Sequence, residues 1–143
     1  MGATVTAYWP GISVNDIESQ PGFYKDDKAW GNWMANREEH TDVIEAMTRL
    51  NVGALCTYKT DGVEDTDVEW ATPSELERAA LRLRELVLAG HPDTKRILEV
   101  YAQSANAVDS INEEFARDLA DVAELARFAA QAGASRMTLE VNW

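Results

Sequence analysis

Two segments near opposite ends of the sequence alternate between apolar and polar residues. The first covers residues 3–9 and the second covers residues 136–142. A period of two, with several β-branched residues, is typical of a strand that buries one face. Apolar residues at helical spacing fill most of the sequence between them. We therefore expect one sheet that includes both terminal strands and is covered by the intervening helices.

Six segments between these strands have helix signals, namely apolar stripes, polar start residues, and glycine or proline at the ends. The predicted helices run from Ser13 to Gln20, from Lys25 to Arg37, from Thr41 to Asn51 or Gly53, from Thr72 to Gly90, from Pro92 past Tyr101, and from Asp109 to Gly133. A further short strand is predicted over Ala54–Tyr58, and a polar loop follows it from Lys59 to Glu69.

The clearest local signal is Thr72-Pro73-Ser74-Glu75, in which the Thr72 side chain can accept from the amide of Glu75. The last helix has an apolar stripe and a set of carboxylates outside it. The stripe consists of Ile111, Phe115, Leu119, Val122, Ala126 and Ala129. The carboxylates expected to face water are Glu113, Glu114, Asp118, Asp121 and Glu124.

These elements predict an α+β fold. We expect a single mixed or antiparallel sheet of about three to five strands, including both terminal strands, covered by about four to six helices. The chain has 143 residues, which suits one domain spanning 1–143, because domain sizes cluster near this length.

The sequence is strongly acidic, with a formal net charge of −12. Such a field repels phosphate backbones and anionic membrane surfaces, so nucleic-acid binding and membrane docking are not expected. A basic protein is the natural electrostatic complement.

The single cysteine, Cys56, allows no internal disulfide and fits a reducing compartment. Since no signal-peptide pattern or long apolar run is seen, we expect a cytoplasmic protein.

The sequence predicts no catalytic residue, metal site or cofactor. Cys56 lies in a predicted strand and is expected in the core, while His40 and His91 lack the partners of a metal or acid–base site. The polar loop from Lys59 to Glu69 is rich in carboxylates. It does not fit the calcium-binding EF-hand spacing, because Trp70 takes the place of the required glycine. A solvated loop is the simplest interpretation, and a contact surface for a basic partner is the next.

Two tryptophans, Trp30 and Trp33, share the predicted helix at Lys25–Arg37, which also contains Gly31. Core packing is the favoured interpretation for all the tryptophans. These two are nevertheless the best candidates for partial exposure, and tryptophan is enriched at interaction hot spots.

The second half of the sequence resembles the YfbM-like family of small uncharacterised bacterial proteins. The resemblance rests on residues 70–76 with Ala79, Ala80 and Leu83, and on the closing helix and strand from Phe115 to Val141. It covers roughly half the chain, and its residues are mainly capping and core residues. The resemblance implies an α+β fold, a bacterial source and a cytoplasmic location, and it implies no activity.

Two hypotheses for function follow. The first is a non-enzymatic protein that binds a basic protein, for example an immunity protein that neutralises a toxin. Its expected contact residues are Trp30, Trp33, Asp61, Glu64, Asp65, Asp67 and Glu69. The second is a small-molecule binder or enzyme with a pocket formed by the two tryptophans, nearby carboxylates and His40.

Overall fold

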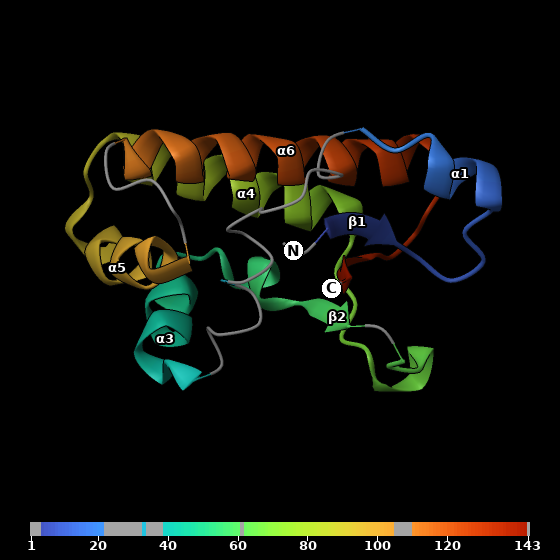
Figure 1. The fold of residues 1–143 in the computed structure, drawn as a ribbon, viewed down its shortest axis with the longest axis horizontal. Helices are drawn as coiled ribbons and strands as arrows, with labels where there is room; N and C mark the ends of the chain where they lie inside the picture. Colours follow the sequence, from blue (N-terminus) through green and yellow to red (C-terminus); the bar gives the residue numbers. More distant parts are fainter. Residues whose placement is uncertain (1–3, 22–32, 34–38, 61, 105–109, 143) are drawn as a thin grey trace.

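The computed structural model describes residues 4–21, 33, 39–60, 62–104 and 110–142, and the statements below concern these residues. They form one three-stranded sheet, five α-helices and three short 3₁₀ helices (Figure 1). The elements are β1 (Thr4–Tyr8), α1 (Val14–Glu18), α3 (Thr41–Arg49), η2 (Gly53–Cys56), β2 (Tyr58–Thr60), η3 (Asp65–Asp67), α4 (Pro73–Leu88), η4 (Pro92–Thr94), α5 (Lys95–Ser104), α6 (Ile111–Gln131) and β3 (Thr138–Asn142). The predicted helix at 25–37 and its Trp30 lie outside the described residues, apart from Trp33.

The sheet has the order β1-β3-β2, so the C-terminal strand lies in its centre. β1 runs antiparallel to β3, with Val5 opposite Val141, and β2 runs parallel to β3, with Lys59 opposite Glu140. The predicted α+β class, the mixed sheet and the inclusion of both terminal strands are confirmed.

The strand predicted over Ala54–Tyr58 is wrong in position. Residues 53–56 form η2, in which the amide of Thr57 donates to the carbonyl of Ala54 at 3.3 Å, and the strand begins only at Tyr58. Leu55 is fully buried in this turn. A short apolar run fits a buried turn as well as a strand, and periodicity alone does not separate the two.

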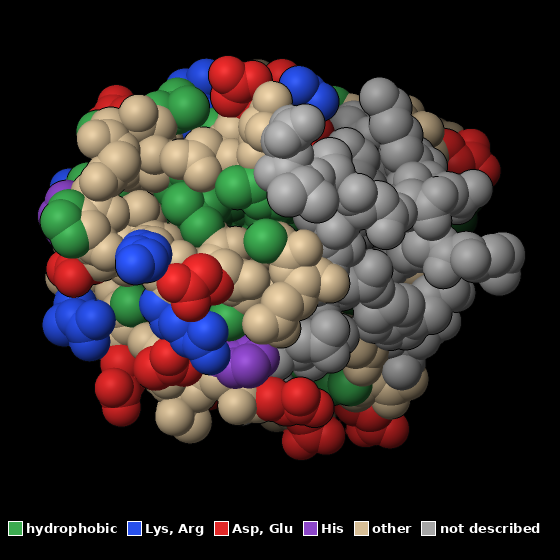
Figure 2. Space-filling model, turned by 60° about the vertical axis from the view of Figure 1, so that its left-hand side comes forward, with side chains coloured by type: hydrophobic (Ala, Val, Ile, Leu, Met, Phe, Trp, Pro, Cys, Tyr) green, Lys and Arg blue, Asp and Glu red, His purple; other side chains and the backbone are tan. Residues whose placement is uncertain are grey.

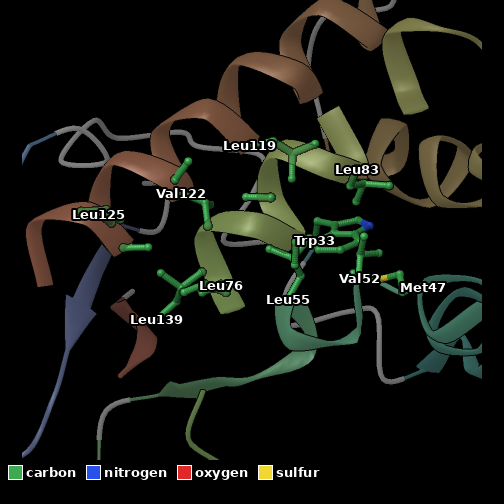
Figure 3. Close-up of a cluster of buried hydrophobic side chains, with 14 of the residues drawn as sticks. Trp33, Met47, Val52, Leu55, Leu76, Leu83, Leu119, Val122, Leu125 and Leu139 are labelled. Carbon is green, nitrogen blue, oxygen red and sulfur yellow. The ribbon is translucent and has the colours of Figure 1, made fainter. Parts of the chain in front are cut away.

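The core lies between the helix pair α4–α6 and the apolar face of the sheet. α4 and α6 run side by side along one side of the molecule (Figure 1). Leu139 of β3 points toward Leu76 of α4 and Leu125 of α6 (Figure 3). All three are fully buried, so the alternating and helical stripes of the sequence close on one interior. Within the described ranges, no helix has both the length and the apolar character needed to cross a bilayer.

Several helix ends follow the sequence signals. The Thr72 hydroxyl accepts from the amide of Glu75 at 3.1 Å, as predicted. Asn51, Gly90 and Gly133 have positive φ angles of 61°, 71° and 89°, the left-handed conformation that ends a helix. Thr41 is not the N-cap of α3: the helix begins at Thr41 and His40 precedes it, so the hydroxyl group lies inside the first turn.

Asp118 corrects another expectation, because it is buried rather than facing water. It is 3% exposed, and the hydroxyl group of Tyr101 donates to its carboxylate at 2.5 Å. Tyr101 comes from α5, so this bond joins α5 to α6. The Tyr101 ring also packs on Phe115, with ring centroids 4.5 Å apart. A carboxylate inside the core is tolerated because a donor from another element accompanies it.

We predict that Tyr101→Phe lowers the free energy of unfolding by about 1–3 kcal/mol, because a buried carboxylate loses a donor while the ring volume is kept. Urea denaturation at neutral pH measures the change. Tyr8→Phe is the control, since the Tyr8 hydroxyl group bonds an exposed carboxylate, and it should cost less. Equal losses in the two variants would contradict the role given to the buried pair.

We also predict an alkaline loss of stability that depends on Tyr101. Burial, and then the charge of Asp118, raise the pKa of Tyr101 above its ordinary value of 10.0. The unfolded chain therefore releases this proton at about pH 10, while the folded protein holds it, so stability falls as the pH rises further. The difference in unfolding free energy between wild type and Tyr101→Phe should shrink between pH 9 and pH 11 in urea titrations. A difference that stays constant over that interval would show that Tyr101 does not contribute.

Candidate functional site

The polar face of the sheet carries a connected group of charged and aromatic side chains. Thr6, Glu140 and Lys59 lie directly opposite one another on the three strands, and residues paired in this way share a face. Tyr8 lies two residues along β1 from Thr6, so it belongs to the same face. The sequence placed Thr6 and Tyr8 on the polar side of the first strand, and the structure agrees.

Lys59 is the centre of this group. Its ammonium group lies 2.9 Å from the Glu140 carboxylate and 4.2 Å from the centroid of the Tyr8 ring. Only 8% of the residue is exposed. The sequence placed Lys59 at the start of the polar loop, whereas the structure places it in β2. A lysine that is nearly buried keeps its charge favourably only with partners such as these.

Tyr8 connects the sheet to residues 62–70, which we call the acidic loop. Its hydroxyl group donates to the Asp65 carboxylate at 2.8 Å, and this hydrogen bond is the main cause that raises the pKa of Tyr8, followed by burial. The Tyr8 ring stacks on Trp70, with centroids 6.0 Å apart. The guanidinium group of Arg136 lies 4.9 Å from the Trp70 ring centroid. The loop between β2 and α4 is therefore held to the sheet at Asp65 and again at Trp70.

The carboxylates of this loop point outward. Glu64, Asp65, Asp67 and Glu69 are all exposed, and the structure brings them together over residues 64–69, as the sequence predicts. Asp61 lies outside the described residues. Asp67 and Glu69 also line a hollow of about 260 Å³ next to residues 56–58. Exposed carboxylates around a hollow of this size can accept an ammonium or guanidinium group of a partner.

Trp33 does not share this surface. It is fully buried, among the hydrophobic side chains drawn in Figure 3. Its ring packs edge-on against Phe115, with ring centroids 5.6 Å apart. The partial exposure considered for Trp33 is wrong, and the favoured core position is confirmed. The apolar side chains around Trp33 come from α4, α6 and η2 (Figure 3). The local sequence around Trp33 does not reveal these distant neighbours.

His91 and Cys56 each contact a nearby residue of the fold. The Nδ1 atom of His91 accepts from the amide of Asp93 at 3.1 Å, so His91 caps the short helix η4. The sulfur of Cys56 lies 3.9 Å from the sulfur of Met47, and the residue is half-buried. Among the described residues, no three His, Cys, Asp or Glu side chains are grouped so that they could hold a metal ion.

A second hollow, of about 420 Å³, lies between α3 and α5. In it, Arg96 bonds Asp42 at 2.7 Å and Glu99 at 3.2 Å. The hydrogen bond from Arg96 lowers the pKa of Asp42. On the face shown in Figure 2, basic and acidic side chains alternate. Arg96 thus pairs with two of the carboxylates that line this groove.

A third hollow, of about 340 Å³, lies beside Trp9 and the C-terminal end of α6. Neither His40 nor Trp33 lines any of these three hollows. The small-molecule hypothesis rests on a pocket that joins His40 to the tryptophans, and none of these three hollows joins them.

Sequence reasoning missed Tyr8 and Arg136 as contacts of the acidic loop, and it missed that Lys59 and Glu140 lie beside Tyr8. One signal was present, since Glu140 alternates with buried residues of the last strand and so had to lie on the polar face. Its pairing with Lys59 depends on the parallel register of β2, which the sequence alone does not specify.

No family model matches this chain, and neither a curated protein nor a solved structure shows significant similarity to it. The resemblance to the YfbM-like family stays a prediction.

We predict that Asp65→Asn lowers the pKa of Tyr8 toward its ordinary value of 10.0, because a carboxylate that accepts the Tyr8 hydroxyl proton is replaced by a neutral amide. The ¹³C chemical shift of the Tyr8 Cζ atom, followed by NMR from pH 8 to pH 12, measures it. Asp67→Asn removes the same charge from the same turn and should leave the Tyr8 pKa nearly unchanged. Equal effects of the two substitutions would show that the Tyr8–Asp65 bond does not hold the loop.

Proposed function

We propose that this chain is a binding protein that holds a basic protein partner on the acidic loop. Three observations support the proposal: the net charge of −12, the exposure of Glu64, Asp67 and Glu69, and the hollow that Asp67 and Glu69 line. Trp30 and Asp61 stay in the proposal as predicted contacts, because they lie outside the described residues. Trp33 acts from the core, as a support for the fold.

The anchoring of the acidic loop is the observation that carries the proposal. The Asp65–Tyr8 hydrogen bond and the Tyr8–Trp70 stack hold both halves of the loop against the sheet. A loop that is already ordered loses less conformational entropy when a partner binds. Its free carboxylates can then face the partner in a fixed arrangement, which favours one partner over other cations.

The most specific form of this proposal is a cytoplasmic immunity protein that neutralises a basic toxin. Electrostatic attraction between an acidic protein and a basic partner increases the association rate at low ionic strength. Fast association suits a protein that must intercept a toxin before the toxin acts. The same electrostatics make the complex weaken as salt screens the charges over about 8–10 Å.

We predict that neutralising the acidic loop abolishes capture of the partner. Immobilised wild-type chain is exposed to lysate of the native cell at 50 mM and 500 mM salt, and bound proteins are identified by mass spectrometry. We expect a basic protein at low salt that is reduced at high salt, and at least tenfold less of it on the triple variant Glu64→Gln/Asp67→Asn/Glu69→Gln, since each lost contact to a charged partner weakens binding.

The matched control is Glu85→Gln/Glu113→Gln/Glu124→Gln, which removes three exposed carboxylates from α4 and α6. It changes the net charge equally and should retain the partner. If both triple variants lose the partner alike, the interaction depends on overall charge and the acidic loop is not the site. If no basic protein is enriched at either salt concentration, the proposed function is wrong.

A further inference from the structure

Within the described residues, a side chain and not a neighbouring strand bonds the outer edge of β1. The amide of Ala7 donates to the Oε1 atom of Gln20 at 2.7 Å, and the Nε2 atom of Gln20 donates to the Ala7 carbonyl at 2.8 Å. Both residues are buried, with Ala7 2% and Gln20 7% exposed. A primary amide that bonds both backbone groups of one residue reproduces the pairing that a neighbouring strand would give.

The pairing geometry shows that the backbone N–H and C=O groups of Ala7 point away from β3. In an antiparallel pair, alternate residues direct their N–H and C=O groups to the partner strand, and the others direct them outward. Because Gln20 takes both groups of Ala7, the bonds to β3 come from Thr6 and Tyr8, which lie opposite Glu140 and Thr138. The edge at Ala7 is therefore the position where another strand could add.

The β1 sequence has none of the usual protections of an edge strand. Exposed edges are commonly guarded by charged residues, by proline or by bulges. Residues 4–8 read Thr-Val-Thr-Ala-Tyr, which are uncharged and mostly favourable in strands. The chain protects this edge from outside the strand: after Pro10 it turns, with the Ile12 amide donating to the Trp9 carbonyl at 3.2 Å, and α1 then returns Gln20 to Ala7.

We propose that Gln20 is a built-in block on the β1 edge and that the strand it excludes is β1 of a second copy of this chain. Two such strands are uncharged over residues 4–8, and they can pair antiparallel about a two-fold axis near Ala7. Without Gln20, the free N–H and C=O groups of Ala7 bond to the second copy, and the two sheets become continuous.

This inference is independent of the proposed partner binding, because the acidic loop is anchored on the polar face and Gln20 acts at the β1 edge. The two also respond oppositely to salt. Capture of a basic partner weakens as salt rises, whereas association of two copies, each carrying −12, strengthens when their repulsion is screened.

The test compares wild type with Gln20→Ala at equal concentration and at 50 mM and 500 mM salt. Light scattering after size exclusion measures the mass, and hydrogen exchange measures protection of the Ala7 amide. We expect the mass of Gln20→Ala to rise toward twice that of the wild type, more at high salt, with the Ala7 amide still protected. An unchanged mass, or a larger mass with a rapidly exchanging Ala7 amide, overturns the proposal.

Two further variants keep the test decisive. Gln20→Asn retains an amide that is one methylene too short to bond both groups, and it should associate even if Gln20→Ala folds poorly. Gln20→Lys also removes the paired bonds but places a charge at the edge, which guards it, so this variant should keep the wild-type mass. Association of Gln20→Lys to the same degree as Gln20→Ala would mean that general destabilisation is the cause.

Discussion

The packing of α4 against α6 is the most extensive contact between elements of the described chain, and β3 packs on this helix pair (Figure 3). The buried stripes of both helices contain several alanines, whose small side chains let two helices pack closely. These alanines are Ala79, Ala80, Ala116, Ala123, Ala126 and Ala129. Larger residues of the same stripes, such as Leu76 and Leu125, reach the sheet through Leu139. β3 thus packs on the side of the helix pair that faces the sheet. Because β3 lies between β1 and β2, it also positions these two strands.

Because β3 holds β1 on one side and β2 on the other, the polar face of the sheet is assembled from three distant parts of the sequence. Lys59, Glu140 and Tyr8 meet only for this reason. Their ion pair and ring contact keep a lysine charge in a nearly buried position. The acidic loop depends on the same arrangement, since the side chains of Asp65 and Trp70 both contact Tyr8, which is distant from them in sequence.

Sequence patterns were sufficient where local chemistry decides the structure. Spacing and residue type predict both terminal strands, the stripes of α4 and α6, the Thr72 cap, and the glycines at 90 and 133. Sequence patterns were insufficient where a partner distant in sequence decides the structure. Asp118 looked like a solvated carboxylate until Tyr101 of α5 supplied a donor, and residues 54–58 fit a strand as well as the turn that they form. For the candidate site, the sequence indicated the carboxylates of the acidic loop but not the residues that anchor them.

The central position of β3 also has a kinetic consequence. Thr4 is paired with Asn142, so closing the sheet brings together residues that are separated by almost the whole described chain. Bringing such distant residues together lowers the chain entropy before the contact stabilises the fold. Proteins rich in contacts of this kind therefore fold slowly. The segments that form the helix pair α4–α6 are nearer to each other in the sequence than β1 is to β3. Because β1 and β2 each pair with β3 in the described sheet, neither strand has its sheet hydrogen bonds until β3 is in place.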